Sequence, residues 1–294
     1  MFHIAIIFKI LPKGSHNKLS LYINKFILLF LTPFLSDSLK DFLILLPFSL
    51  FRFIIFPLRL FSLYYYHRAL SYLAMRLLLN KTIVIGGKKF FCRNFNDLLH
   101  VVPYYENQIL HWFKNTVDKG EVFIDIGAHI GRYTVLFAPF CKKVVSIEPD
   151  PYNFSILRRN VLLNRLDNVI LFNCGCYSDG GEGFLYLSPF NYGGHSLKND
   201  LIFDGKVRVR LKRLDDIIEE ANIKYSDVGL IKIDVEGVEK EVLLGAHKIL
   251  IMGKPKIIIE SLNFREVSKI LSVYGYQLCD VDNFTKHNFL FSKM

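Results

Sequence analysis

The sequence predicts an α/β fold in which helices cover both faces of a mostly parallel sheet. From residue 121 onward, short apolar runs alternate with helical stretches of roughly 10–15 residues, a pattern typical of right-handed βαβ units. Several of these runs are hydrophobic at nearly every position, which indicates strands buried on both faces. A chain of 294 residues is long enough for one large domain, or for one domain with an appendage.

The predicted elements follow one another in a regular order along the chain. A strand at 82–85 and a helix at 107–117 precede the alternating region. Two segments with more open alternation, 184–188 and 207–211, predict a hairpin closed by a long glycine-bearing loop, and the chain ends in a second predicted hairpin. The expected buried strands are 121–127, 144–149, 168–175, 229–235 and 256–261, and the expected helices are 130–140, 151–164, 215–222, 239–250 and 264–274.

Residues 1–80 are predicted to form a hydrophobic, helical extension, separate from a domain at 81–294. Nine Lys and Arg against two acidic residues give the extension a net charge of +7, out of +10 for the whole chain. An apolar run at 42–63 is long enough to cross a bilayer, but Arg52 and Arg59 within it favour a helix that lies on anionic lipid. The alternatives are a single-pass helix and an extension packed on the domain or a partner. We expect the cytoplasmic side of a membrane, or the cytoplasm if the extension packs on the domain.

Composition excludes several classes of protein. A hydrophobic content of 51% argues against disorder, and five scattered cysteines argue against a disulfide framework and favour a reducing compartment. Cys174 and Cys176 lack a His/Cys cluster that would complete a metal site, so we expect buried cysteines and no metal. The remaining net charge of +3 on residues 81–294 makes nucleic acid an unlikely partner.

Acidic residues stand at the carboxyl ends of the predicted strands, where open α/β sheets bind ligands. Asp125 and Gly127 end the first buried strand, Glu148 ends the second and Asp234 ends the fourth. A dinucleotide fingerprint would need glycine where His129 stands, and the neighbouring carboxylate disfavours phosphates. The turn therefore favours a cationic ligand without phosphates, and S-adenosylmethionine is such a ligand. Glu148 would accept hydrogen bonds from its ribose hydroxyls.

The strand at 230–236 is unusually polar for a central parallel strand, because Lys232, Asp234 and Glu236 share one face at a period of two. Burying these groups is costly unless they pair or line a cavity. One interpretation is an ion pair between Lys232 and Asp234 near the strand end. The other is catalytic: Asp234 and Glu236 face the transferred group and deprotonate or orient a nucleophile, with Lys232 beside the substrate.

Three further residues are candidates for contact with a substrate. Glu260 ends the next strand and faces the same crevice or caps the following helix. The loop PFNYGGHS contains Tyr192, which could stack on a sugar ring, and His195, which could act as a base or remain a solvated loop histidine. Glu239, by contrast, is expected to interact with the first turn of its own helix.

Four sequence blocks, taken in order, resemble the FkbM-type methyltransferase family of class I S-adenosylmethionine-dependent enzymes. They read VFIDIGAHIGRYT, SIEPDPYNFSILRRNVLLN, NVILFNCGCYSD and GLIKIDVEGVEKEVLLGA, and the resemblance covers about residues 100–262. It implies a Rossmann-like class I methyltransferase sheet. The first 80 residues have no counterpart in it.

The resemblance also implies roles for individual residues. Asp125, Gly127 and Gly131 would surround the methionine part of the cofactor and Glu148 would hold its ribose. His129, where the family usually has Asn, can still form hydrogen bonds. Gly175 and Cys176, where Ala-Leu is common, would contact the adenine, with Cys176 donating its backbone N–H. Asp234 would lie near the transferred methyl group.

The sequence therefore predicts an S-adenosylmethionine-dependent O-methyltransferase that acts on a hydroxyl of a sugar, glycolipid or related metabolite, with membrane association through residues 1–80. One alternative is an RNA base methyltransferase, since tRNA-modifying enzymes share the first three blocks. Another is a non-catalytic scaffold that retains the fold. Intact Asp125, Glu148 and Asp234 argue against the scaffold.

Overall fold

A computed structural model describes most of the chain after residue 79. By contacts, the chain divides into two compact units, Met1–Ile85 with Cys92–Phe95, and Gly86–Phe91 with Asn96–Met294. The predicted extension, and with it the predicted membrane contact, lies outside the described residues, as does most of the predicted helix at 107–117. The described residues are 80–101, 113, 117, 120–188, 194–198, 205–279 and 288–293.

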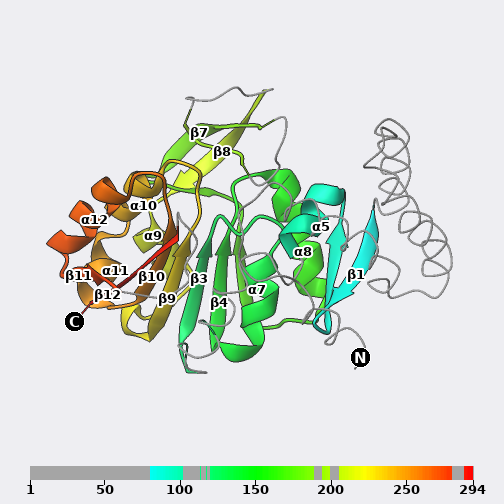
Figure 1. The fold of residues 1–294 in the computed structure, drawn as a ribbon, viewed down its shortest axis with the longest axis horizontal. Helices are drawn as coiled ribbons and strands as arrows, with labels where there is room; N and C mark the ends of the chain where they lie inside the picture. The colour runs from blue at the N-terminus through cyan, green and yellow to red at the C-terminus, as the bar shows by residue number, and fades with distance from the viewer. Residues whose placement is uncertain are drawn as a thin grey trace, which may run out of the picture. The chain divides into compact units, whose positions relative to one another are not determined.

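A seven-stranded sheet forms the centre of the second unit (Figure 1), in the order β11-β12-β10-β9-β3-β4-β5. Strands β5, β4, β3, β9 and β10 pair in parallel, and β12 pairs antiparallel with both β10 and β11. This confirms the predicted fold class of a mostly parallel sheet with a C-terminal antiparallel hairpin. The strands are β3 (Val122–Ile126), β4 (Lys143–Ile147), β5 (Val169–Phe172), β9 (Val228–Ile233), β10 (Lys256–Glu260), β11 (Tyr276–Leu278) and β12 (Asn288–Lys293).

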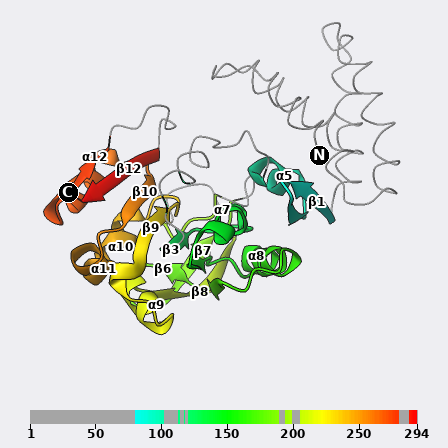
Figure 2. The same ribbon diagram turned by 90° about the horizontal axis from the view of Figure 1, so that it is seen from below.

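Helices cover both faces of this sheet, because its parallel strands are apolar on both sides. One face, with Ile124 and Ile231, packs against α9, α10, α11 and α12. The opposite face, with Phe123 and Leu230, packs against α7 and η2. Figure 2 shows α7 and the α9–α11 group on opposite sides of β3 and β9. The helices are α7 (Arg132–Phe137), η2 (Ala138–Phe140), α8 (Pro151–Leu163), α9 (Leu214–Glu220), η3 (Tyr225–Asp227), α10 (Glu239–Leu244), α11 (His247–Met252) and α12 (Phe264–Val273).

A second, three-stranded sheet lies toward the carboxyl ends of the parallel strands (Figure 1). It contains β6 (Gly175–Cys176), β7 (Gly181–Tyr186) and β8 (Lys206–Lys212) in the order β6-β8-β7. The antiparallel pairing of β7 with β8 confirms the predicted hairpin. Leu185 of β7 is buried, whereas Phe184 is exposed, as the alternating pattern predicts.

Several local predictions differ from the structure. The helix predicted at 239–250 is interrupted after Leu244, where a Cβ on Gly245 would lie 2.1 Å from the carbonyl oxygen of Tyr177, so the chain bends at this close approach. The third buried strand splits into β5 and β6. Strand β1 (Lys81–Ile85) was expected, but β2 (Lys88–Cys92) and α5 (Phe95–Val101) were not. None of the described helices is long and apolar enough to cross a membrane.

Candidate active site

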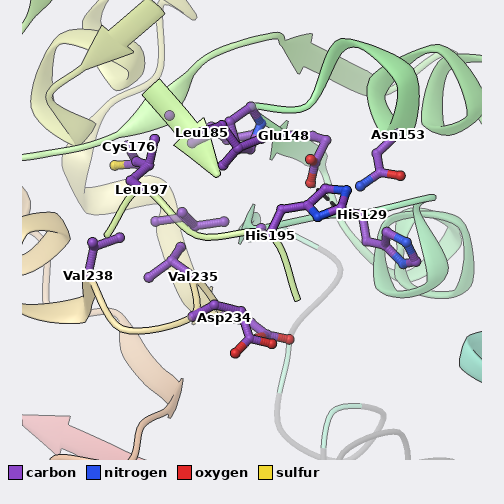
Figure 3. Close-up of a pocket in the computed structure, with 16 residues that line it drawn as sticks. His129, Glu148, Asn153, Cys176, Leu185, His195, Leu197, Asp234, Val235 and Val238 are labelled. Carbon is purple, nitrogen blue, oxygen red and sulfur yellow. Dashed lines mark hydrogen bonds between the residues drawn. The ribbon is translucent and has the colours of Figure 1, made fainter. Parts of the chain in front are cut away.

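A cleft opens where β3, β4 and β9 end, beneath the second sheet (Figure 3). The space between its lining atoms is about 510 Å³, a figure that includes open solvent at the mouth. The loops after the three strands contribute most of its polar lining, as expected at the carboxyl ends of an open α/β sheet. Eight predicted site residues line it: Gly127, His129, Glu148, Gly175, Cys176, His195, Asp234 and Glu236.

The floor of the cleft is the tight turn after β3. Gly127 has a φ of +80°, and a Cβ there would lie 1.7 Å from the carbonyl oxygen of Asp234. The backbone N–H groups of Gly127 and Ala128 both donate to the carbonyl of Ile147, at 3.0 Å each. The backbone N–H of Asp234 donates to Ile126 at 3.0 Å. Glycine is therefore required where the ends of three strands come together.

One end of the cleft is built around Glu148, whose carboxylate is buried. Its Oε2 accepts from the backbone N–H of His129 at 2.8 Å, and its Oε1 accepts from that of Asp150 at 3.0 Å. Asn153, in the first turn of α8, also bonds this carboxylate. Burial nevertheless raises the pKa of Glu148 to about 7. These hydrogen bonds occupy three of the roughly four acceptor positions of a carboxylate, so Glu148 can accept a further hydrogen bond from a ligand.

His129 serves this corner through its backbone rather than its ring. Its φ of 51° turns the N–H toward Glu148, and its Nε2 lies 4.0 Å from Oδ1 of Asp97. The ring also makes a T-shaped contact with His100. In Figure 3 the imidazole points away from the middle of the cleft.

An apolar slot lies beside this corner. Gly175 and Cys176 of β6 form one wall, and Leu185, Leu197 and Val238 complete it (Figure 3). A Cβ on Gly175 would approach the Leu197 side chain to 2.9 Å, so glycine keeps the slot narrow but open. Burial raises the pKa of the Cys176 thiol well above its usual value, which makes it a small apolar wall rather than a nucleophile.

The opposite end of the cleft carries Asp234 (Figure 3), which is 29% exposed and accepts from Nζ of Lys232 at 2.8 Å. Lys232 is buried behind it, over the ring of Tyr133 and directly across from Asp125 in the register of β9 and β3. The ion pair considered from sequence is therefore present. It does not exclude the catalytic interpretation, because Asp234 still lines the cleft.

Glu236 stands next to Asp234 at the mouth of the cleft, on a strained turn. Its φ is 51°, and Gly237 follows with a φ of 98°. The residue is exposed, but its carboxyl group is partly withdrawn from water. This desolvation, with the nearby carboxylates of Asp234 and Glu239, raises the pKa of Glu236 to about 7.

Segment 194–198 joins the two ends of the cleft. Nδ1 of His195 accepts from the backbone N–H of Ser188 at 3.0 Å, so Nε2 carries the proton and points at Oδ2 of Asp150, 3.3 Å away. Buried Ser196 donates from Oγ to the carbonyl of Glu236 at 2.6 Å. His195 thus faces the Glu148 end, whereas its neighbour holds the Glu236 turn.

Four predicted site residues lie elsewhere in the described part of the chain. Asp125 is buried behind the turn, where Oδ2 accepts from Thr134 and Oδ1 has no hydrogen-bond partner among the described residues. Gly131 begins α7, Lys232 stands behind Asp234, and Glu260 lies at the end of β10. None of the four lines the cleft. Tyr192 lies outside the described residues.

Sequence reasoning missed several residues that shape the cleft. Asp150 caps α8 through Tyr152 N–H and faces His195, and Asn153 reaches Glu148 from the same turn. Their position just after an acidic strand end was a usable signal. Leu197 and Ser196 carried no such signal, because only the folded loop brings them to the cleft.

Comparison with known proteins agrees with this geometry. The family model for the methyltransferase FkbM domain matches residues 125–278, more than half of the chain. The chain belongs to the FkbM methyltransferase family. The matched segment runs from the end of β3 to β11 and includes every described residue of the cleft. S-adenosylmethionine is the cofactor of this FkbM methyltransferase domain.

Curated relatives of this chain include methyltransferase sdnD of Sordaria araneosa, at 34% identity over 42% of this chain and 60% of that protein. Methyltransferase 1 of Beauveria bassiana is 28% identical over 42% of this chain and 57% of the relative. The hexuronic acid methyltransferase AglP of Haloferax volcanii is 24% identical over 57% of this chain and 68% of the relative. The chain thus spans about 60% of the length of the first two relatives.

Similar solved structures include methyltransferase FkbM from Methylobacillus flagellatus, with a TM-score of 0.42 and 20% identity over 67% of this chain and 54% of that one. Another is TYW2 of M. jannaschii in complex with AdoMet, with a TM-score of 0.38 and 14% identity over 72% of this chain and 83% of that one.

Proposed function

We propose that this protein is an S-adenosylmethionine-dependent O-methyltransferase that acts on a hydroxyl of a sugar, glycolipid or related metabolite. The observation that carries the proposal is the layout of the cleft: a buried carboxylate at one end, an apolar slot beside it, and two carboxylates at the other end. A nucleoside with a cationic tail matches these features in order.

The residues of the cleft fit the cofactor. Glu148 has an acceptor position left for a ribose hydroxyl, and the slot of Gly175, Cys176 and Leu197 suits a flat adenine ring. Asp234, at the opposite end, supplies negative charge for the amino-acid part, near the Gly127 turn. When bound, S-adenosylmethionine supplies a methyl group on a positively charged sulfur.

The protein's own contribution to such a transfer is alignment, exclusion of water and removal of a proton from the acceptor. Carboxylates at the mouth of the cleft suit a hydroxyl acceptor, whose proton must leave as the new bond forms. The hexuronic acid methyltransferase among the relatives makes a hexuronate glycan the first acceptor to assay.

A labelled-methyl assay tests this proposal. The full chain would be incubated with S-adenosylmethionine carrying a radioactive methyl group and, separately, with hexuronate glycans, neutral glycans, glycolipids and tRNA. We expect label in a glycan or glycolipid, stable to mild base as an ether is. Label in tRNA alone would contradict the proposal and support an RNA methyltransferase, and calorimetry showing no cofactor binding by folded protein would support the scaffold.

We further propose that residues 1–80 rest on the cytoplasmic face of a membrane. The support is compositional: a net charge of +7 together with long apolar runs matches anionic lipid. Sedimentation with vesicles of phosphatidylserine and phosphatidylcholine, against phosphatidylcholine alone, tests it. Changing Arg52, Arg59 and Arg68 to Gln should weaken binding to the anionic vesicles, and binding that is indifferent to lipid charge would refute the electrostatic part.

A further inference from the structure

Two acidic residues at the mouth of the cleft are candidates for taking the acceptor proton, and the structure distinguishes them. Asp234 is paired with buried Lys232 at 2.8 Å, so protonating it would give up that ion pair. Glu236 has no ion pair with a cation in the described part of the chain. It lines the cleft and reaches solvent, where an acceptor must enter.

The peptide unit that joins Glu236 to Gly237 is held at both of its polar atoms. The Glu236 carbonyl accepts from Oγ of Ser196 at 2.6 Å. The N–H of Gly237 donates to Oε1 of Glu239 at 2.7 Å, and Oε2 of Glu239 accepts from Ser261 at 3.3 Å. Ser196 itself is fixed by a two-way backbone bridge to Tyr186, at 2.8 and 3.1 Å.

These contacts maintain a conformation that is unfavourable for a residue with a side chain. The left-handed backbone at Glu236, with a φ of 51°, costs about 1–2 kcal/mol outside glycine. Strain at the mouth of a cleft, next to a peptide unit that is held by two hydrogen bonds, indicates that the direction of the Glu236 side chain matters for function.

We propose that Glu236 takes up the proton of the acceptor hydroxyl, and that Ser196 and Glu239 are positioning residues that hold it at the cleft. This inference rests on the proposed O-methyltransferase function. As the hydroxyl oxygen forms its bond to the methyl carbon, the carbon–sulfur bond breaks with its electron pair remaining on sulfur, and the hydroxyl proton passes to the Glu236 carboxylate.

The charges around Glu236 are compatible with this role near neutral pH. Asp234 and Glu239 face it and raise its pKa, Lys232 opposes them, and the side chain of Lys198 lies beside Gly237. Partial desolvation is the largest contribution, and together these effects put the pKa at about 7. A carboxylate with this pKa is a stronger base than an ordinary glutamate and is still substantially ionised at pH 7.

The test compares Glu236→Gln with Asp234→Asn, and uses Glu241→Gln, a carboxylate of α10 that does not line the cleft, as the control. With saturating cofactor, kcat of the unaltered protein should rise with pH around a midpoint near 7. Glu236→Gln should lose about 100-fold in kcat or more, together with this pH dependence, while calorimetry shows unchanged binding of S-adenosylhomocysteine. Asp234→Asn should keep a pH dependence with a lower midpoint, because the Asp234 carboxylate raises the pKa of Glu236, and Glu241→Gln should match the unaltered protein.

Ser196→Ala tests the positioning role. Its kcat should fall about 10-fold with little change in the KM for cofactor, whereas a purely structural role would lower only the thermal stability. Carbon-13 NMR of glutamate-labelled protein provides a readout without turnover. Two carboxyl resonances, from Glu148 and Glu236, should titrate near pH 7, and one of the two should disappear in Glu236→Gln.

Undiminished kcat in Glu236→Gln, or loss of the pH dependence in Asp234→Asn instead, would overturn the inference while leaving the methyltransferase proposal intact. Absence of methyl transfer by the unaltered protein to any acceptor would overturn the proposed function, and this inference with it.

Discussion

Replacing Gly127 by alanine is the sharpest test of how the cleft is built. Gly127, Gly131 and Gly87 have nearly the same φ, +80°, +87° and +78°. An alanine at each position therefore has a similar backbone strain, about 1–2 kcal/mol, in the left-handed conformation. They differ in what a Cβ would meet. It would meet nothing within 4 Å at Gly87, the flexible Leu157 side chain at 2.5 Å at Gly131, and the Asp234 carbonyl oxygen at 1.7 Å at Gly127.

The Gly127 contact cannot be relieved locally, because the opposing atom belongs to the backbone. Bringing it to the 3.0 Å at which real Cβ contacts begin requires a shift of about 1.3 Å in the Asp234 carbonyl. We expect Gly87→Ala to cost about 1 kcal/mol of unfolding free energy and Gly127→Ala about 3 kcal/mol or more. A displacement of this size beside the reacting atoms should also lower methyl transfer about 100-fold. Gly131→Ala should fall between the two in stability.

Urea denaturation measures the stability of each variant. The labelled-methyl assay measures the rate of methyl transfer, and calorimetry with S-adenosylhomocysteine measures binding in the cleft. If Gly127→Ala matched Gly87→Ala in both stability and methyl transfer, the contact with the Asp234 carbonyl would have no effect, since the left-handed strain is common to both variants. Equal losses of methyl transfer in Gly131→Ala and Gly127→Ala would show that strain rather than the Asp234 contact decides the outcome.

Three other changes have defined outcomes. Burial raises the pKa of Glu148 to about 7 from an ordinary 4.5. The cofactor-free protein should therefore lose about 3 kcal/mol of stability between pH 4.5 and 7. Urea titrations of Glu148→Gln should show a smaller change of stability over this pH range. Lys232→Met removes the positive charge beside Asp125 and Asp234 and should lower the unfolding free energy by about 3 kcal/mol. Adding Asp234→Asn should restore part of this stability. Thermal melts without such a recovery would argue against the Lys232–Asp234 ion pair. His195→Asn can keep an acceptor for the backbone N–H of Ser188 but loses the contact with Asp150. Calorimetry should therefore show that S-adenosylhomocysteine binds about 5-fold more weakly, while the pH dependence of kcat is retained.

The sign of the Glu148 prediction follows from linkage. Its pKa in the folded protein is higher than in the unfolded chain, so the folded state binds the proton more tightly. The corresponding stability is fully present below about pH 4.5 and is lost as the pH rises through 7. A cofactor that donates hydrogen bonds to the ionised Glu148 carboxylate should reduce this loss of stability. Thermal melts with S-adenosylhomocysteine across the same pH range measure the reduction.

The local pattern of residues determined the sheet and the end of it that carries chemistry. Runs that are apolar at nearly every position, such as VFIDI, are expected between two layers of helices. Glu148 and Asp234 come close together because parallel strands have their carboxyl ends at one edge of the sheet. The alternation of apolar and polar residues at 184–188 and 207–211 identified β7 and β8, because successive side chains of a strand point to opposite faces of the sheet.

Only the tertiary structure decided which acidic residues reach the cleft. Asp125 and Glu148 look alike in sequence, but Asp125 lies within β3 and is covered by Thr134 of α7, whereas Glu148 lies beyond β4 and lines the cleft. The contacts of Ser196 with Glu236, 40 residues away, and of His195 with Asp150 are likewise invisible in a local pattern. Periodicity specifies the face of an element, but the closing of a loop over a cleft depends on partners that are brought together only when the whole domain folds.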